Sequence, residues 1–289
     1  MRVAFVTAGD VGAGHVAHAY AIHQGLRRAG SRVEFRAFGP AAPFPFVAHL
    51  PFIYEPIAID FRPFLERETA LQTPLALALA LYAPDLVLVD LFWAPLLYIF
   101  ETLQASKWLL ARKCPDAWWK GTPRLRFEPR QYDRIIVTEP VEHPNETHRI
   151  APLVVANRDE LEPVGALRAA LGVSLDEQLV VVAHAGVVGE AERLDPGYDQ
   201  VRSVRFDAYE TQFPFPLARW LNDADVIFAG GGYNTVWESL WLGYHDRVHF
   251  TGFPRNVDDQ QWRIECARTT TTMKENGADP LARWILAGG

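Results

Sequence analysis

The 289-residue sequence lacks the features that mark several specialised classes of protein. Its two cysteines, Cys114 and Cys266, lie far apart and form no paired motif, which argues against a disulfide scaffold and a zinc site. No apolar run reaches the roughly 18 residues that a transmembrane helix needs. The first residues lead directly into a predicted strand without the pattern of a signal peptide. We therefore expect a cytoplasmic protein, either free or peripheral to the membrane.

An excess of positive charge is also missing. The net charge is −7, and residues 151–289 hold most of the acidic excess, whereas residues 1–150 are nearly balanced. No nucleic-acid partner is expected, because phosphate backbones require a basic face. One basic segment, residues 107–134, is interleaved with tryptophans. It is interpreted either as a solvated surface or as a contact surface for a membrane or an anionic acceptor.

Strand and helix signals alternate along the chain, which predicts an α/β fold with mostly parallel sheets. The predicted strands span residues 3–7, 32–37, 86–89, 134–137, 179–183, 226–229 and 247–250. The predicted helices span residues 15–29, 164–171, 234–242 and 260–267. A proline-containing stretch near residues 139–163 separates two Rossmann-like domains, residues 1–148 and a compact 149–289, which we expect to face each other across a cleft. Residues 40–64, rich in proline and phenylalanine, are predicted to form a long loop that acts as a lid or packs over the core.

The most informative motif is Asp225–Glu238, in which an apolar strand ends in three glycines and a helix begins at Asn234 and Thr235. Free backbone N–H groups and the positive end of the helix dipole favour a phosphate at such a junction. Glu238 could reach two ribose hydroxyls, and the group Asp258–Gln261 could bind further hydroxyls. This order suits a sugar nucleotide. Taken singly, Glu238 could merely stabilise a helix start and the second group could merely cap a helix.

Two further loops contain glycine. Gly12 and Gly14 match a dinucleotide-binding fingerprint only in part, because the loop is too wide, so no nicotinamide or flavin cofactor is expected. His15 begins a predicted helix at the edge where parallel sheets bind ligands, which makes it a candidate general base or a packing histidine. No carboxylate stands at ligand spacing from the nearby histidines, so no metal is expected. Gly186, after a later strand, could add backbone donors or could belong to a plain turn.

Together these motifs resemble the two-domain GT-B glycosyltransferases. The closest groups are the lipid II-forming N-acetylglucosaminyltransferase type (family 28) and the UDP-glycosyltransferase type (family 1). The resemblance is carried by residues 12–15, 84–90, 132–138, 167–186 and 224–261, with Gly232–Glu238 as the specific part. The chain is unusually short for these families.

The resemblance implies a role for each matching residue. It assigns the catalytic base to His15, the donor ribose to Glu238, the donor diphosphate to Gly186, Gly231, Gly232, Asn234 and Thr235, the sugar hydroxyls to Asp259 and Gln260, and the acceptor-side loop to Gly12, Gly14 and Asp90. It implies an inverting, metal-independent transfer from a nucleoside-diphosphate sugar, with UDP favoured, to an acceptor hydroxyl, without a cofactor. Two positions depart from the pattern: Gly230 replaces a histidine, and Tyr98 replaces the aspartate that orients the base in plant-type relatives.

Two other functions are compatible with the same residues: a non-catalytic subunit that binds a sugar nucleotide or a partner, and a sugar-nucleotide epimerase. The acceptor is not identified by the sequence, although residues 40–64 and 107–134 suggest an apolar or membrane-associated molecule. The oligomeric state and the group that orients His15 are left open.

Overall fold

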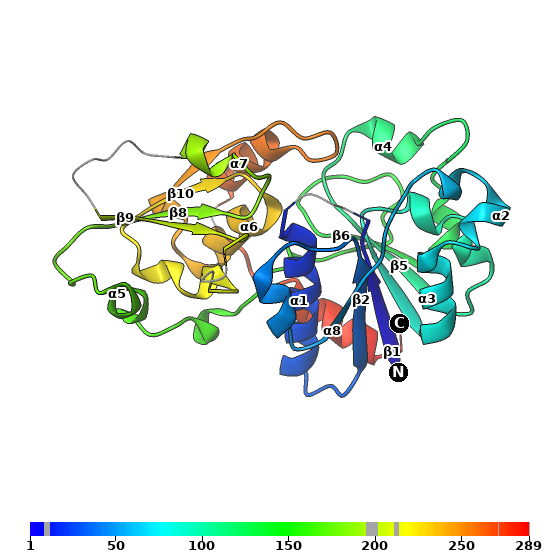
Figure 1. Cartoon of the computed structure of the whole chain (residues 1–289), viewed down its shortest axis with the longest axis horizontal. Helices are drawn as coiled ribbons and strands as arrows, with labels where there is room; N and C mark the ends of the chain where they lie inside the picture. The colour runs from blue at the N-terminus through cyan, green and yellow to red at the C-terminus, as the bar shows by residue number, and fades with distance from the viewer. Residues whose placement is uncertain (9–11, 195–201, 211–213, 271, 289) are drawn as a thin grey trace.

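The structure, a computed structural model, describes residues 1–8, 12–194, 202–210, 214–270 and 272–288. It contains two separate parallel β-sheets, one formed by each half of the chain (Figure 1). The expected α/β architecture with two Rossmann-like sheets is therefore confirmed. No helix in the described ranges is long and apolar enough to cross a bilayer.

The N-terminal sheet has seven parallel strands in the order β3-β2-β1-β4-β5-β6-β7. They are β1 (Arg2–Val6), β2 (Glu34–Gly39), β3 (Ile53–Pro56), β4 (Leu86–Asp90), β5 (Ser106–Ala111), β6 (Arg134–Val137) and β7 (His148–Arg149). The central strand β4 is buried along its whole length, as expected where helices cover both faces of a parallel sheet.

Strand β2 begins two residues later than predicted. Its pairing with β1 begins with Glu34 opposite Arg2, and this register buries Phe35, Ala37 and Phe38. Strand β5 is absent from the prediction, because its short apolar core lies inside the basic segment 107–134. Trp108 of that segment is 1% exposed, so this part of the segment belongs to the core and not to a contact surface.

The C-terminal sheet has four parallel strands in the order β11-β10-β8-β9. They are β8 (Leu179–His184), β9 (Arg202–Asp207), β10 (Val226–Gly230) and β11 (Val248–Thr251), accompanied by the helices α5 (Ala166–Leu171), α6 (Tyr233–Leu242) and α7 (Gln260–Thr269). The predicted strands and helices of this half agree with these bounds to within about two residues at each end. Strand β9 is not predicted, because only two of its six residues, Val204 and Phe206, are apolar.

The helices of the first half are α1 (Gly14–Arg28), α2 (Arg67–Ala70), α3 (Pro74–Tyr82) and α4 (Asp116–Lys120). The last helix of the chain, α8 (Ala278–Leu286), returns to this half and packs beside α1 (Figure 1). The approach is so close that a Cβ on Gly25 would overlap the backbone carbonyl of Ala278. Ion pairs from Arg28 to Asp279 (2.6 Å) and to Glu160 (2.9 Å) border the contact. The chain end therefore ties its own half to the N-terminal sheet.

A buried polar network also joins the two halves. The guanidinium of Arg263, in α7, donates to Glu139 (2.6 Å) and to Asp258 (2.6 Å), and the side chains of Arg263 and Glu139 are completely buried. Trp237 of α6 donates its indole N–H to the same Glu139 carboxylate (2.8 Å). Because Glu139 follows β6 of the N-terminal sheet, this network fixes α6 and α7 against the opposite half.

The segment 40–64 packs between the two halves. Phe46 stacks on Phe215 with ring centroids 4.0 Å apart, and Phe44 contacts the ring of Tyr209 at 5.0 Å. The segment also contains the short edge strand β3, which is not predicted. Of the two interpretations of this segment, lid or packing, its aromatic side chains fit packing in this state.

Candidate active site

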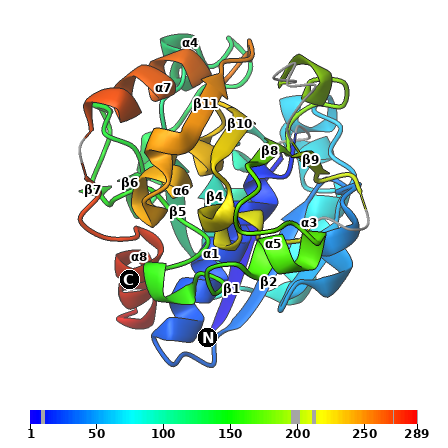
Figure 2. The same cartoon turned by 90° about the vertical axis from the view of Figure 1, so that its left-hand side faces the viewer.

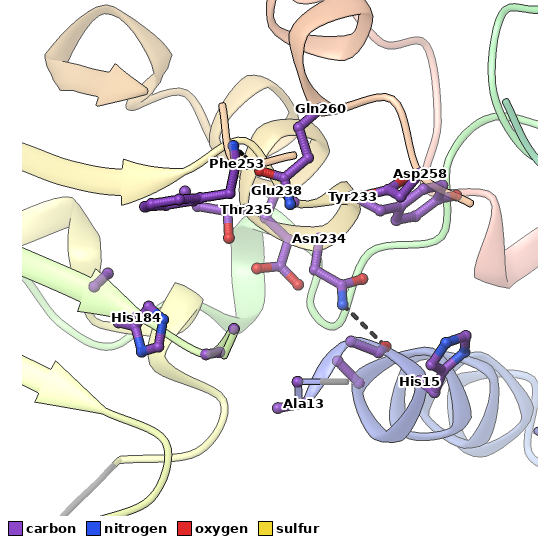
Figure 3. A pocket seen from close by; sticks show the side chains of 18 of the residues that line it. Ala13, His15, His184, Tyr233, Asn234, Thr235, Glu238, Phe253, Asp258 and Gln260 are labelled. Carbon is purple, nitrogen blue, oxygen red and sulfur yellow. Dashed lines mark hydrogen bonds between the residues drawn. The ribbon is translucent and has the colours of Figure 1, made fainter. Parts of the chain in front are cut away.

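A cavity of about 570 Å³ lies between the carboxyl ends of the two sheets, the position where ligands bind in open parallel sheets. The loops after β1, β4 and β5 form one wall, and those after β8, β10 and β11 form the other. The lining includes Gly12–His15, Phe92, Arg112, Ala183–Val187, Gly230, Gly232–Thr235, Glu238, Phe253–Asp258 and Gln260. Figure 3 shows residues of both walls converging on this space. The fold thus brings most of the predicted site residues together.

The start of α6 opens onto the cavity. In Figure 2 the C-terminal half, which contains α6, faces the viewer. Gly232 is the N-cap residue, in an extended conformation, and no other described part of the protein lies within 4 Å of the position where a Cβ would stand. The N–H groups of a helix's first turn have no partner within that helix and attract an anion together with the helix dipole. Asn234 and Thr235 line the same space. The helix start therefore has the geometry and charge of a phosphate cradle.

Gly231 has a different position from the one predicted. It does not line the cavity; its N–H donates to the carbonyl of Thr251 (2.9 Å). A Cβ at this position would lie 2.6 Å from Ile264 of α7. The glycine is needed because α7 packs closely there, and it is Gly232 and the residues after it that line the cavity.

The glycine loops of the two halves touch each other. The N–H of Ala13 donates to the carbonyl of Ala185 (2.8 Å), and the side-chain amide of Asn234 donates to the carbonyl of Gly14 (3.0 Å; Figure 3). Gly12 has φ +70°, and a Cβ added to it would lie only 2.6 Å from the Ala185 oxygen. Gly186 adjoins this contact. Asn234, a predicted diphosphate ligand, therefore contacts the acceptor-side loop in this state.

Glu238 is a buried acid at the cavity wall. Its side chain points into the cavity beside Asn234 and Thr235 (Figure 3), and the residue is 8% exposed. Burial raises the pKa of the Glu238 carboxyl to about 8, although a hydrogen bond with the Val155 backbone acts in the opposite direction. No cation forms an ion pair with it among the described residues. A carboxyl group that is buried without a cation is suited to form hydrogen bonds with the hydroxyls of a ligand.

The acidic group after β11 is arranged differently from the prediction. Asp259 caps α7 by accepting from the N–H of Trp262 (3.0 Å), and it does not line the cavity. Asp258 and Gln260 do line it. The Gln260 side-chain oxygen accepts from the N–H of Phe253 (2.9 Å), which leaves its amide N–H₂ as a donor. The alternative interpretation of Asp259 as a helix cap fits its contacts, and Asp258 is the carboxylate nearer the site.

On the opposite wall, His15 and His18 share one carboxylate. The Nδ1 atoms of His15 and His18 lie 2.6 Å and 3.0 Å from Oδ2 of Asp90, and all three residues are buried. Burial raises the pKa of Asp90, but the neighbouring His18 and His15 outweigh it and hold that pKa well below its usual range. An ionised Asp90 can only accept, so both Nδ1 atoms must donate. The Nε2 of His15 is then left to accept a proton.

In this cluster Asp90 holds the imidazole of His15 in position. The cluster also corrects the premise that no carboxylate lies near the histidines. The sequence shows no carboxylate at ligand spacing from the histidines, yet the fold places Asp90 between two of them. The three ligand atoms lie within 4.8 Å of one another, a grouping that could hold a metal ion. The 2.6 Å separation of Asp90 and His15 is a hydrogen-bond distance; two ligands of one zinc ion, each at about 2.0 Å, would stand farther apart. Leu91, directly after Asp90, has φ +67°, a strained backbone conformation of the kind that is concentrated at functional sites.

Sequence reasoning does not identify Arg112, which lines the cavity directly after β5. It belongs to the basic segment 107–134, and nothing marks it as the end of a strand unless β5 is recognised. The Arg255–Glu190 pair (2.6 and 2.7 Å) and the buried His184 are missed as well. His184 ends β8, whereas Glu190 and Arg255 lie in the loops that follow β8 and β11.

Comparisons with known proteins agree on the fold. No protein-family model matches the sequence, and no curated protein does so either. Among solved structures, the glycosyltransferase SsfS6 from Streptomyces sp. SF2575 is 15% identical, with a TM-score of 0.58 over 100% of this chain and 95% of that one. MurG from Acinetobacter baumannii is 11% identical, with a TM-score of 0.51 over 99% of each chain. The spinosyn rhamnosyltransferase SpnG in complex with thymidine diphosphate is 15% identical, with a TM-score of 0.52 over 100% of this chain and 96% of that one. The chain therefore has the GT-B fold.

Proposed function

We propose that this protein is a glycosyltransferase that moves a sugar from a nucleoside-diphosphate sugar, with UDP favoured, to an acceptor hydroxyl. The observation that carries the proposal is the cavity between the sheets, which has a phosphate cradle and a buried acid on one wall and the His15–Asp90 pair on the other. The fold adds support, since SsfS6 and SpnG, which share it, have both been solved with thymidine diphosphate.

The C-terminal wall, in residues 149–289, is assigned to the donor. The first N–H groups of α6 and the side chain of Thr235 bind the diphosphate, and Glu238 binds the ribose hydroxyls. Asp258 and Gln260 face the donor sugar from the loop after β11. The Asn234 amide joins the diphosphate ligands once its bond to the Gly14 carbonyl opens, so donor binding requires a small separation of the two glycine loops.

The N-terminal wall, in residues 1–148, is assigned to the acceptor. His15 Nε2 takes the proton of the acceptor hydroxyl as its oxygen attacks the anomeric carbon. The bond from that carbon to the diphosphate oxygen breaks, and its electron pair leaves with the nucleoside diphosphate. The α6 N-terminus stabilises the negative charge that develops there, so no metal is required. Attack on the face opposite the leaving group inverts the anomeric configuration. Asp90 stabilises the protonated His15.

Binding and turnover are tested separately. Titration calorimetry with UDP, dTDP and GDP establishes the nucleotide, and chromatography of each nucleotide sugar incubated with the protein follows slow hydrolysis. We expect one nucleotide to bind and its sugar to be hydrolysed by the wild type but not by His15→Ala, which should keep its nucleotide affinity. Absence of binding by every nucleotide would contradict the proposal.

The same experiment distinguishes the two alternatives. Tight binding without enzymatic hydrolysis of the nucleotide sugar, and without transfer to any acceptor, would indicate a non-catalytic binding subunit. Conversion of the nucleotide sugar into an epimer, with the nucleotide still attached, would indicate an epimerase. The contact between Asn234 and Gly14 makes a non-catalytic state worth testing, because it occupies a predicted diphosphate ligand.

A further inference from the structure

Arg112 is a partly buried cation on the acceptor wall of the cavity. It follows β5, whose residue Leu110 pairs with Asp90 of β4, so Arg112 stands at the same sheet edge as the His15–Asp90 pair. It lines the cavity, and its Nε atom is buried without a hydrogen-bond partner among the described residues. Within the same ranges no carboxylate lies within ion-pair distance of its guanidinium. A close neighbour is the ring of Tyr233, 5.8 Å from the guanidinium carbon.

The two acids whose charges act on Arg112, Asp90 and Asp258, already form hydrogen bonds with other residues. Asp90 accepts from both histidines, and Asp258 accepts from Arg263. Their charges act on Arg112 only at longer range, where they raise its pKa against the effect of burial. A partly desolvated guanidinium without a bidentate partner is costly, and carboxylates and phosphates match its planar donor fork. Arg112 therefore has the properties of a residue that binds an anionic ligand.

An aromatic surface lies beside the candidate base on the same wall. The ring of Phe92 contacts that of His15 (5.3 Å between centroids) and that of Trp118 (5.3 Å), and Phe92 lines the cavity. All these residues belong to the N-terminal half. A base, an apolar ring surface and the Arg112 guanidinium thus occupy one wall, opposite the phosphate cradle of α6.

We propose that the acceptor is a hydroxylated molecule that carries a carboxylate or phosphate group, and that Arg112 binds this anionic group while the hydroxyl lies at His15. The apolar body of the acceptor packs on Phe92. The inference rests on the proposed glycosyl transfer and adds the substrate class. Arg112 could instead contact the diphosphate of the donor. The experiment below distinguishes this alternative from binding of the acceptor.

The test compares Arg112→Gln with the wild type, and uses Arg124→Gln, an exposed arginine of the same segment, as the matched control. Titrations are made with UDP, dTDP and GDP alone, UDP being the one expected to bind, and, at saturation with the nucleotide that binds, with 4-hydroxybenzoate, 4-hydroxyphenyl phosphate and the neutral 4-hydroxybenzamide. We expect the wild type and the control to bind one of the two anions about tenfold or more tightly than the amide, the range for a charged hydrogen bond. Arg112→Gln should lose this preference and keep its affinity for UDP.

Each other result overturns the inference in a recognisable way. No preference of the wild type for either anion would refute an anionic acceptor while leaving donor binding intact. A tenfold or greater loss of UDP affinity in Arg112→Gln, with the anion preference unchanged, would assign Arg112 to the diphosphate. Failure of every nucleotide to bind the wild type would instead contradict the proposed function itself. Circular dichroism of both variants confirms that the comparison is made between folded proteins.

Discussion

Glu238→Gln isolates the energetic cost of the buried acid. The folded-state pKa of Glu238 is about 8, whereas a glutamate in an unfolded chain has a pKa of about 4.3. Since the folded pKa is raised, the folded state binds the proton more tightly than the unfolded state. The contribution of the protonated acid is complete below the unfolded pKa and is lost as the pH rises towards the folded pKa. Wild-type stability should therefore fall between about pH 4 and pH 8 through this group.

The size of the effect follows from the two pKa values. The difference of nearly four units, at about 1.4 kcal/mol per unit, corresponds to about 5 kcal/mol in total and roughly 4 kcal/mol between pH 5 and pH 8. Glutamine keeps the shape and cannot ionise. The difference in free energy of unfolding between Glu238→Gln and the wild type should thus grow in favour of the variant by roughly this amount over that interval.

Urea denaturation at pH 5, 6, 7 and 8 measures this difference directly. Glu68→Gln, at an exposed position of α2, is the control and should run parallel to the wild type. The reasoning is refuted if the Glu238→Gln curve also runs parallel, because the carboxyl would then be as well solvated as Glu68. Saturating UDP should reduce the difference in free energy of unfolding between Glu238→Gln and the wild type, since the ribose hydroxyls would supply the hydrogen bonds that the buried Glu238 carboxylate lacks. Glu238→Ala should weaken UDP binding by about 1.5–3 kcal/mol, the cost of losing a charged hydrogen bond.

Three further predictions concern other parts of the molecule. Asp90→Asn removes the charge that supports His15 and should lower kcat by roughly 10²-fold or more at unchanged nucleotide affinity, measured by steady-state kinetics and calorimetry; a normal kcat would exclude the His15–Asp90 pair from the reaction. Arg263→Met leaves Glu139 buried without its cation and should lower the free energy of unfolding by about 3–5 kcal/mol, with much of the loss restored when Glu139→Gln is added; an additive double variant would contradict the coupling. Gly25→Ala should loosen α8 by about 1–3 kcal/mol, because the new Cβ meets Ala278, and hydrogen exchange of residues 278–286 should accelerate; unchanged exchange would show that α8 docks independently of α1.

Prediction from the sequence succeeds best where local sequence and fold agree. The stretch from Asp225 to Glu238 combines a buried strand, glycines and an amphipathic helix, and each of these patterns depends only on neighbours in the chain. The same holds for β8 and for α7. Short strands such as β5 and β9 are missed because they contain few apolar residues, which charged residues flank in β5 and interrupt in β9, so only pairing with neighbouring strands defines them.

The sequence by itself determined the α/β class, the junction of strand, glycines and helix at the start of α6, and the presence of a histidine at the start of α1. Tertiary structure decided which of these residues meet. Asp90 and His15 are 75 positions apart, and only the parallel pairing of β1 with β4 places the carboxylate against the imidazole. Likewise, the close packing of α7 turns Gly231 away from the cavity, and the cap of α7 engages Asp259. Such choices depend on which surface an element buries, a property of the assembled sheets and helices that no local pattern contains.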